Sequence, residues 1–148
     1  MQTTVEQDLA QHLLALWNHI IRGSVGRSLG LLEELGLGLH QVKTLDALHG
    51  LDFEPTVKEL GERLGLSLPG ISRNVDGLLR AGYLERREDE HDRRMKRLRL
   101  TDAGFDAIER LNAARLEGLE SFTAALPRDQ AERLAAALAP ITEGLPSR

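Results

Sequence analysis

The feature of this sequence that most limits its fold is the stretch TVKELGERLGLSLPGISRNVDGLLRAGYL, which begins at Thr56. Its apolar residues form two stripes at helical spacing, and Gly65 separates them. Thr56 is placed to cap the first helix, with Glu59 as the second member of a capping box. Ser67 is placed to cap the second helix. The pattern predicts two short helices joined by a three-residue turn.

Directly after these helices the sequence changes from helical to alternating periodicity. The segments YLERRED and RLRLT flank the polar run EHDRRMK, and Leu98 and Leu100 alternate with charged or polar residues. Alternation of this kind is typical of a strand with one buried face. We therefore expect a β-hairpin with a charged tip, which follows the second helix as a wing.

The flanking segments read as helices. Apolar residues from Val5 to Ile21 predict a first helix, which we expect to end between Ile21 and Leu32 because its glycines each cost about 1 kcal/mol in a helix. A second, short helix ends near Gly50. We expect Thr101 to cap a long helix and Pro127 to open a last one, which Pro140 kinks or shortens.

The predicted fold class is therefore mainly α with one small β hairpin and about six helices. A chain of 148 residues is in the size range of a single hydrophobic core, so we expect residues 1–148 to form one folding unit. The sequence has no basic leader before an apolar run and no apolar stretch of membrane-spanning length, which favours a soluble, cytoplasmic protein.

The charged residues are unevenly distributed along the chain. The formal net charge is −4, yet residues 56–100 carry 11 basic and 8 acidic side chains, a local net charge of +3. Five of these basic residues fall within residues 93–99. Such a density can bind a polyanion locally. A solvated charged hairpin is the alternative interpretation of this feature.

Several chemistries are excluded or disfavoured by residue types. The absence of cysteine excludes disulfides, thiolate zinc sites and thiol redox sensing. His12 and His19 do not form the i, i+4 histidine pair of a zinc helix, so we expect no metal and no cofactor. The glycines match no phosphate loop, and no nucleophile with a base is evident, so we expect no enzymatic activity.

The exposed face of the second helix of the pair carries the residues that suit a DNA major groove. A helix in that groove presents short or fork-shaped polar side chains near its N-terminus. The residues on this face are Ser67, Pro69, Gly70, Ser72, Arg73 and Asn74. Among them, Arg73 could form two hydrogen bonds with a guanine. The alternative is an amphipathic surface helix whose polar face contacts only water.

The predicted wing tip carries the second group of candidate DNA-binding residues, which are Arg93, Arg94, Lys96 and Arg97. Narrow A·T-rich minor grooves attract arginines. We expect Asp92 to hold the Arg94 guanidinium in place through a charge-assisted pair. An ordinary solvated turn aspartate is the other interpretation of Asp92.

These motifs in this order resemble the multiple-antibiotic-resistance regulator (MarR) family. The resemblance rests on the helix-turn-helix, LLRAGYLERR, the DRR of the wing tip and LTDAG, all within residues 56–104. It departs from the family at LGLHQ, where Gly38 or His40 stands in place of a frequent Ser or Thr cap.

The resemblance implies a homodimeric, sequence-specific transcriptional regulator that binds a pseudo-palindromic operator on double-stranded DNA. It implies dimerisation through residues 1–35 and 102–148, with a winged helix-turn-helix lobe at residues 39–101. It further implies that Arg86 contacts a phosphate. Many relatives are repressors that respond to a small aromatic or acidic effector, and we consider Trp17 a candidate lining residue of such a pocket. The alternative function is a protein-interaction module that keeps the fold without reading DNA.

Overall fold

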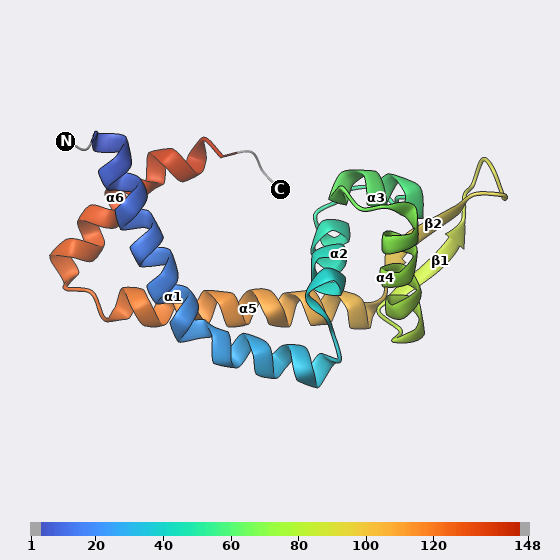
Figure 1. The fold of residues 1–148 in the computed structure, drawn as a ribbon, viewed down its shortest axis with the longest axis horizontal. Coiled ribbons are helices and arrows are strands. Elements are labelled where there is room, and N and C mark those ends of the chain that lie inside the picture. Colours follow the sequence, from blue (N-terminus) through green and yellow to red (C-terminus); the bar gives the residue numbers. More distant parts are fainter. Residues whose placement is uncertain (1–3, 146–148) are drawn as a thin grey trace. The chain divides into compact units, whose positions relative to one another are not determined.

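The fold was obtained as a computed structural model, which describes residues 4–145, apart from the side chain of Ser24. The described residues form six helices and one two-stranded antiparallel sheet (Figure 1). The expectation of a mainly α fold with one small hairpin is confirmed. In chain order the elements are α1 (Val5–Leu35), α2 (Leu39–His49), α3 (Val57–Leu64), α4 (Leu68–Arg80), β1 (Leu84–Glu88), β2 (Lys96–Leu100), α5 (Asp102–Ala124) and α6 (Arg128–Glu143).

The caps of α3 and α4 are those predicted from the sequence. The Thr56 hydroxyl accepts a hydrogen bond from the Glu59 N–H at 3.2 Å, and a Glu59 carboxylate oxygen accepts one from the Thr56 N–H at 2.7 Å. Gly65 ends α3 with a φ of 65°, a left-handed conformation that favours glycine. The Ser67 hydroxyl accepts the Gly70 N–H at 3.3 Å. The helix-turn-helix is therefore specified by local sequence.

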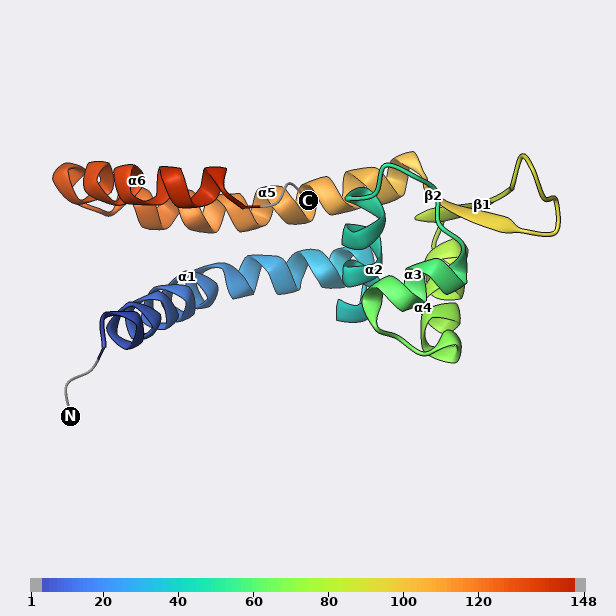
Figure 2. The ribbon, with the colours of Figure 1, turned by 90° about the horizontal axis from the view of Figure 1, so that it is seen from above.

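The hairpin follows α4 through a turn in which Gly82 has a φ of 79°. Strands β1 and β2 pair in a register that sets Leu84 opposite Leu100 and Arg86 opposite Leu98. Leu84 and Leu98 are both buried, as the alternating pattern requires. Figure 2 shows the hairpin extending past α3 and α4.

A single apolar core joins α2, α3, α4, the hairpin and the first half of α5. A backbone hydrogen bond of 2.8 Å from the Leu98 N–H to the Pro55 carbonyl also fixes the loop before α3 against β2. Because each element contributes a fully buried side chain, the positions of α4 and the hairpin are coupled through this core. Its largest buried side chains include Leu45, Leu60, Ile71, Leu78, Leu98 and Ile108.

The junction between the hairpin and α5 is packed backbone against backbone. The Thr101 hydroxyl donates to the Gly82 carbonyl at 2.6 Å and accepts the Gly104 N–H at 3.1 Å, which confirms Thr101 as a helix cap. A Cβ added at Gly104 would lie 3.0 Å from the carbonyl carbon of Tyr83 and closer still to its oxygen. The Tyr83 hydroxyl in turn donates to the Leu35 carbonyl at 2.7 Å. Gly104 is therefore a position where only glycine fits.

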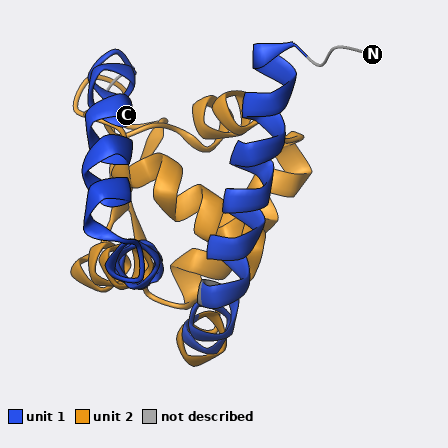
Figure 3. Cartoon of the chain, turned by 90° about the vertical axis from the view of Figure 1, so that its left-hand side faces the viewer, with its two compact units in different colours: residues 1–31, 113–147 blue, residues 32–112, 148 orange. Residues whose placement is uncertain are grey.

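The chain divides into two compact units, residues 1–31 with 113–147 and residues 32–112 (Figure 3). Within the first unit, α1 is joined to α5 by an ion pair of 2.7 Å between Arg27 and Glu117 and by an edge contact between the rings of His19 and Phe122. Apolar side chains of this unit remain exposed at several helix positions. They include Val5, Leu9, Leu13, Leu14, Trp17, Leu29, Leu116, Leu119, Leu138 and Ile141.

Two helix boundaries differ from the sequence-based expectation. Helix α1 does not end between Ile21 and Leu32 but continues to Leu35. A glycine weakens a helix without breaking it, and the remaining residues of α1 are mostly strong helix formers. Of the two effects expected of Pro140, a kink or a shortened helix, the shortening is wrong, since α6 continues to Glu143. Because only three residues follow the proline, the backbone hydrogen bond that it removes lies near the end of the helix.

Candidate nucleic-acid interface

Helix α4 buries one face and leaves the other exposed at its N-terminal end. Ile71, Val75 and Leu78 are fully buried, which fixes the rotation of the helix about its axis. Ser67, Pro69 and Arg73 are exposed, and Gly70, Ser72 and Asn74 are half-buried. The six candidate recognition residues lie at the N-cap and on the first two turns of α4.

Arg73 is the cation of this face that is available to a ligand. It is exposed, and within residues 4–145 no carboxylate forms an ion pair with it. By contrast, the hydroxyl of Ser67 is already used as an acceptor in its own helix cap. The Ser67 O–H can still donate to an outside acceptor, whereas Arg73 is the charged donor of the two and can offer several N–H groups to an anion or a base.

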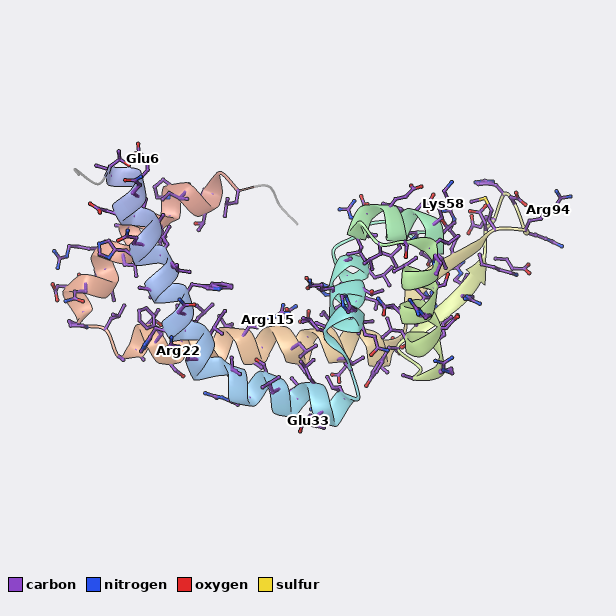
Figure 4. All side chains as sticks on the ribbon, viewed as in Figure 1. Glu6, Arg22, Glu33, Lys58, Arg94 and Arg115 are labelled. Atoms are coloured by element: carbon purple, nitrogen blue, oxygen red, sulfur yellow. The ribbon has the colours of Figure 1, made fainter. Side chains whose placement is uncertain are left out.

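The wing tip carries two exposed arginines, Arg93 and Arg94. Figure 4 shows the side chain of Arg94 at the end of the hairpin, pointing away from it. Asp92 does not hold the Arg94 guanidinium as expected. Its carboxylate instead accepts the backbone N–H of Arg94 at 3.0 Å. Aspartate closes its own turn in this way because the N–H two residues later is within reach of its short side chain.

The other predicted DNA-binding cations are paired with carboxylates of the same chain. Lys96 donates to Glu88 across the hairpin at 2.7 Å. Arg86 pairs at 3.0 Å with Asp76 of α4. Arg97 is only 24% exposed and lies 2.7 Å from Asp89 and 2.9 Å from Glu59. Among the residues that the structure describes, Arg93 and Arg94 at the tip have no ion-pair partner, whereas Arg86, Lys96 and Arg97 are each paired.

Asp89 was not among the predicted site residues, although it organises the base of the wing tip. Its carboxylate accepts from the Arg97 guanidinium at 2.7 Å and from the backbone N–H groups of Asp92 and His91 at 3.0 and 2.8 Å. These hydrogen bonds, that from Arg97 above all, lower the pKa of Asp89 to about 2. The carboxylate is therefore ionised at neutral pH. Its position three residues before Asp92 in a turn was the only sequence signal for this role.

In the first unit, a hollow of about 350 Å³ lies between α1 and α5 and is lined by residues that include His19, Ile20 and Phe122. Trp17, the candidate effector residue, is 62% exposed and does not line it. In the described part of the chain, no three His, Asp or Glu side chains are grouped so that they could hold a metal ion. None of the helices in residues 4–145 combines the length and apolar character needed to cross a bilayer.

Comparison with known proteins finds one family whose sequence model matches the winged segment. The sequence model of the MarR family matches residues 35–95, which run from the end of α1 to the wing tip. Over these residues, which make up less than half of the chain, the winged segment is similar to the MarR family. The matched segment contains ten of the twelve candidate DNA-binding residues, and the other two, Lys96 and Arg97, follow it directly.

Curated relatives match over part of their length. The HTH-type transcriptional regulator PapX of Escherichia coli is 34% identical over 74 residues, which are 50% of this chain and 45% of PapX. PrsX of Escherichia coli is 32% identical over the same length. The matched part of this chain thus spans about half the length of these relatives.

Solved structures share the MarR fold over nearly the whole chain. Transcriptional regulator Tm0710 of Thermotoga maritima has a TM-score of 0.78 at 22% identity, covering 93% of each chain. A mutant of S. aureus MepR bound to an oligodeoxyribonucleotide has a TM-score of 0.69 at 24% identity, covering 90% of this chain and 98% of MepR. MepR bound to ethidium bromide has a TM-score of 0.68 at 22% identity, covering 89% of this chain and 95% of that one.

Proposed function

We propose that this protein is a sequence-specific, DNA-binding transcriptional regulator, and that it acts as a homodimer on a pseudo-palindromic operator. The observation that carries the proposal is one compact unit in which Arg73 is exposed at the α4 N-terminus and Arg93 and Arg94 are exposed at the wing tip, none of them in an ion pair with any other residue of the range 4–145. A helix with these features suits the major groove, and a tip with arginines suits the adjacent minor groove.

The homodimer is supported by the exposed apolar side chains of the first unit. Residues such as Leu13, Trp17, Leu116 and Ile141 are each more than half exposed on α1, α5 and α6. Soluble proteins seldom leave so many large apolar side chains in water, so a second copy of the chain is the partner that we infer for this surface. A symmetric pair of lobes would read half-sites about one helical turn, roughly 10 bp, apart.

A response to a small-molecule effector is a second part of this proposal. MepR, whose fold this chain shares, has been solved with ethidium bromide bound. By analogy we propose that the protein is a repressor whose operator affinity changes on binding a small aromatic or acidic molecule. Trp17 remains a candidate contact for that molecule.

Replacing Arg73 with alanine tests the proposed base reading. If Arg73 forms two hydrogen bonds with a guanine, the variant should lose about 1–3 kcal/mol of discrimination at one operator position. Fluorescence anisotropy with the operator and with each single-base variant measures this loss. Arg80, in the last turn of the same helix, provides a control substitution that should leave base preference unchanged. If wild type and Arg73→Ala showed equal base preference, Arg73 would not read a base. It would then contact the phosphate backbone or no part of the DNA.

A protein-interaction module is the second candidate function. The observation that favours it is the neutralisation of Arg86, Lys96 and Arg97 by carboxylates of the same chain. The two functions differ in the response to salt, because displacing counterions from duplex DNA gives a slope of about −0.9 in log affinity per neutralised phosphate. A protein that does not bind DNA would show no affinity from which to obtain such a slope.

A further inference from the structure

The base of the wing contains an arrangement that is unfavourable in an isolated hairpin. The strand register sets Arg87 directly opposite Arg97. Like charges in directly opposite positions destabilise a pair of strands. In this protein each of the two arginines has carboxylate partners, and these partners explain why the register is tolerated.

Some of these carboxylates belong to other elements. Arg97 donates from its Nε to Asp89 in the wing and from an Nη to Glu59, which caps α3, at 2.9 Å. The same Nη also lies 3.3 Å from the backbone carbonyl oxygen of Glu54. Arg87 donates to the Glu54 carboxylate at 3.2 Å. Asp89 compensates Arg97 within the wing, but the further negative charge of Glu54 and Glu59 reaches the hairpin only when its base lies against the N-terminus of α3 and the loop before it.

Burial is consistent with a structural use of Arg97. Its side chain is 24% exposed and that of Asp89 is 13% exposed, whereas Arg93 and Arg94 at the tip are exposed. Using Arg97 as a phosphate ligand would require separating a guanidinium from two carboxylates. A guanidinium already hydrogen-bonded to two carboxylates has little to gain from a third anion.

We infer that Arg97 is a positioning residue: by binding Asp89 and Glu59 together, it fixes the wing to the start of α3 and so sets where Arg93 and Arg94 lie relative to the recognition helix α4. This inference rests on the proposed function and reassigns Arg97, which the sequence suggested as a direct DNA contact. Glu59 thereby has two functions, since its carboxylate also completes the α3 capping box.

The first test compares affinity and salt dependence. Arg97→Met retains the length of the side chain and removes its charge. The variant should bind the operator about tenfold more weakly, with a slope of log affinity against log salt equal to that of wild type, because no phosphate contact is lost. A slope reduced in magnitude by about 0.9 would identify Arg97 as a phosphate ligand and overturn the inference. Unchanged affinity would also overturn it.

The second test uses a substitution for which net charge and positioning predict opposite changes in DNA affinity. Glu59→Gln keeps an oxygen for the capping box and removes the charge that faces Arg97. If charge alone governed binding, loss of a negative charge would strengthen association with DNA. Positioning through Arg97 predicts weaker binding, and no further loss when Arg97→Met is added. Tighter binding by Glu59→Gln would contradict the inference.

A measurement without DNA separates this inference from the proposed function. In free protein, the amides of residues 89–95 should exchange hydrogen faster in Arg97→Met than in wild type. Lys96→Met is the matched control, because the partner of Lys96 within residues 4–145 is Glu88 of the same hairpin. Its exchange should match wild type. Equal exchange in all three proteins would show that Arg97 does not hold the wing, whereas absence of duplex binding by wild type would reject the proposed function alone.

Discussion

The double substitution Arg93→Ala/Arg94→Ala should weaken binding to duplex DNA by about 100-fold at low salt. Both side chains are exposed at the wing tip and are therefore available to form charge-assisted contacts with DNA. Each such contact contributes about 1.5–3 kcal/mol, and each neutralised phosphate contributes about 0.9 to the salt slope. The slope of the variant should therefore be shallower by about 1 to 2. Fluorescence anisotropy over a range of salt concentrations measures both quantities.

A control for the loss of two positive charges is available in the first unit. Arg128→Ala/Arg133→Ala removes the same charge from two exposed positions on α6, where the described partner of each arginine is a carboxylate four positions away. This control should keep wild-type affinity within about twofold, since exposed pairs of this kind contribute little. If both double variants lost affinity equally, the effect would be one of net charge, and the wing tip would have no specific function.

Replacing Gly104 with alanine should lower the free energy of unfolding by about 3 kcal/mol or more. The added Cβ would overlap the backbone carbonyl of Tyr83, which cannot move like the end of a flexible side chain. Any shift would also disturb the bond from the Thr101 hydroxyl to Gly82 that joins the hairpin to α5. Urea denaturation of the purified variant measures the change.

Gly50→Ala is the matched control for this prediction. A Cβ at Gly50 would lie 3.6 Å from the Asp46 carbonyl oxygen, an ordinary van der Waals contact, and its φ of −84° suits alanine. We expect a change within about 1 kcal/mol. A Gly104→Ala protein as stable as wild type would show that the backbone at this junction is not packed as described.

The parts of the fold that could be predicted from sequence are those set by short-range rules. Thr56 with Glu59, Ser67 with Gly70, and Thr101 with Gly104 are each three residues apart, so the spacing alone indicates the cap. The hairpin was equally evident, because alternation at Leu98 and Leu100 fixes which face of the strand is buried.

The parts that could not be predicted depend on residues distant in sequence or on small energy differences. Arg97 and Glu59 are 38 positions apart, and no local pattern brings them together. The ion-pair partners of a cation could therefore be identified only from the three-dimensional structure. The length of α1 depended on weighing three glycines against many strong helix formers, a balance too close for propensity alone. The Asp92 carboxylate accepts the backbone N–H of Arg94 and not its guanidinium, because a backbone N–H two residues away is the nearer donor.

The most direct test of the central claim is sedimentation velocity of the full chain mixed with a pseudo-palindromic operator duplex at low salt. The chain has a mass of 16.4 kDa. We expect the free protein to sediment as a pair of chains, and the mixture to contain one pair per duplex that dissociates as salt is raised. A single chain that sediments alone and leaves the duplex unbound at every salt concentration would contradict the account.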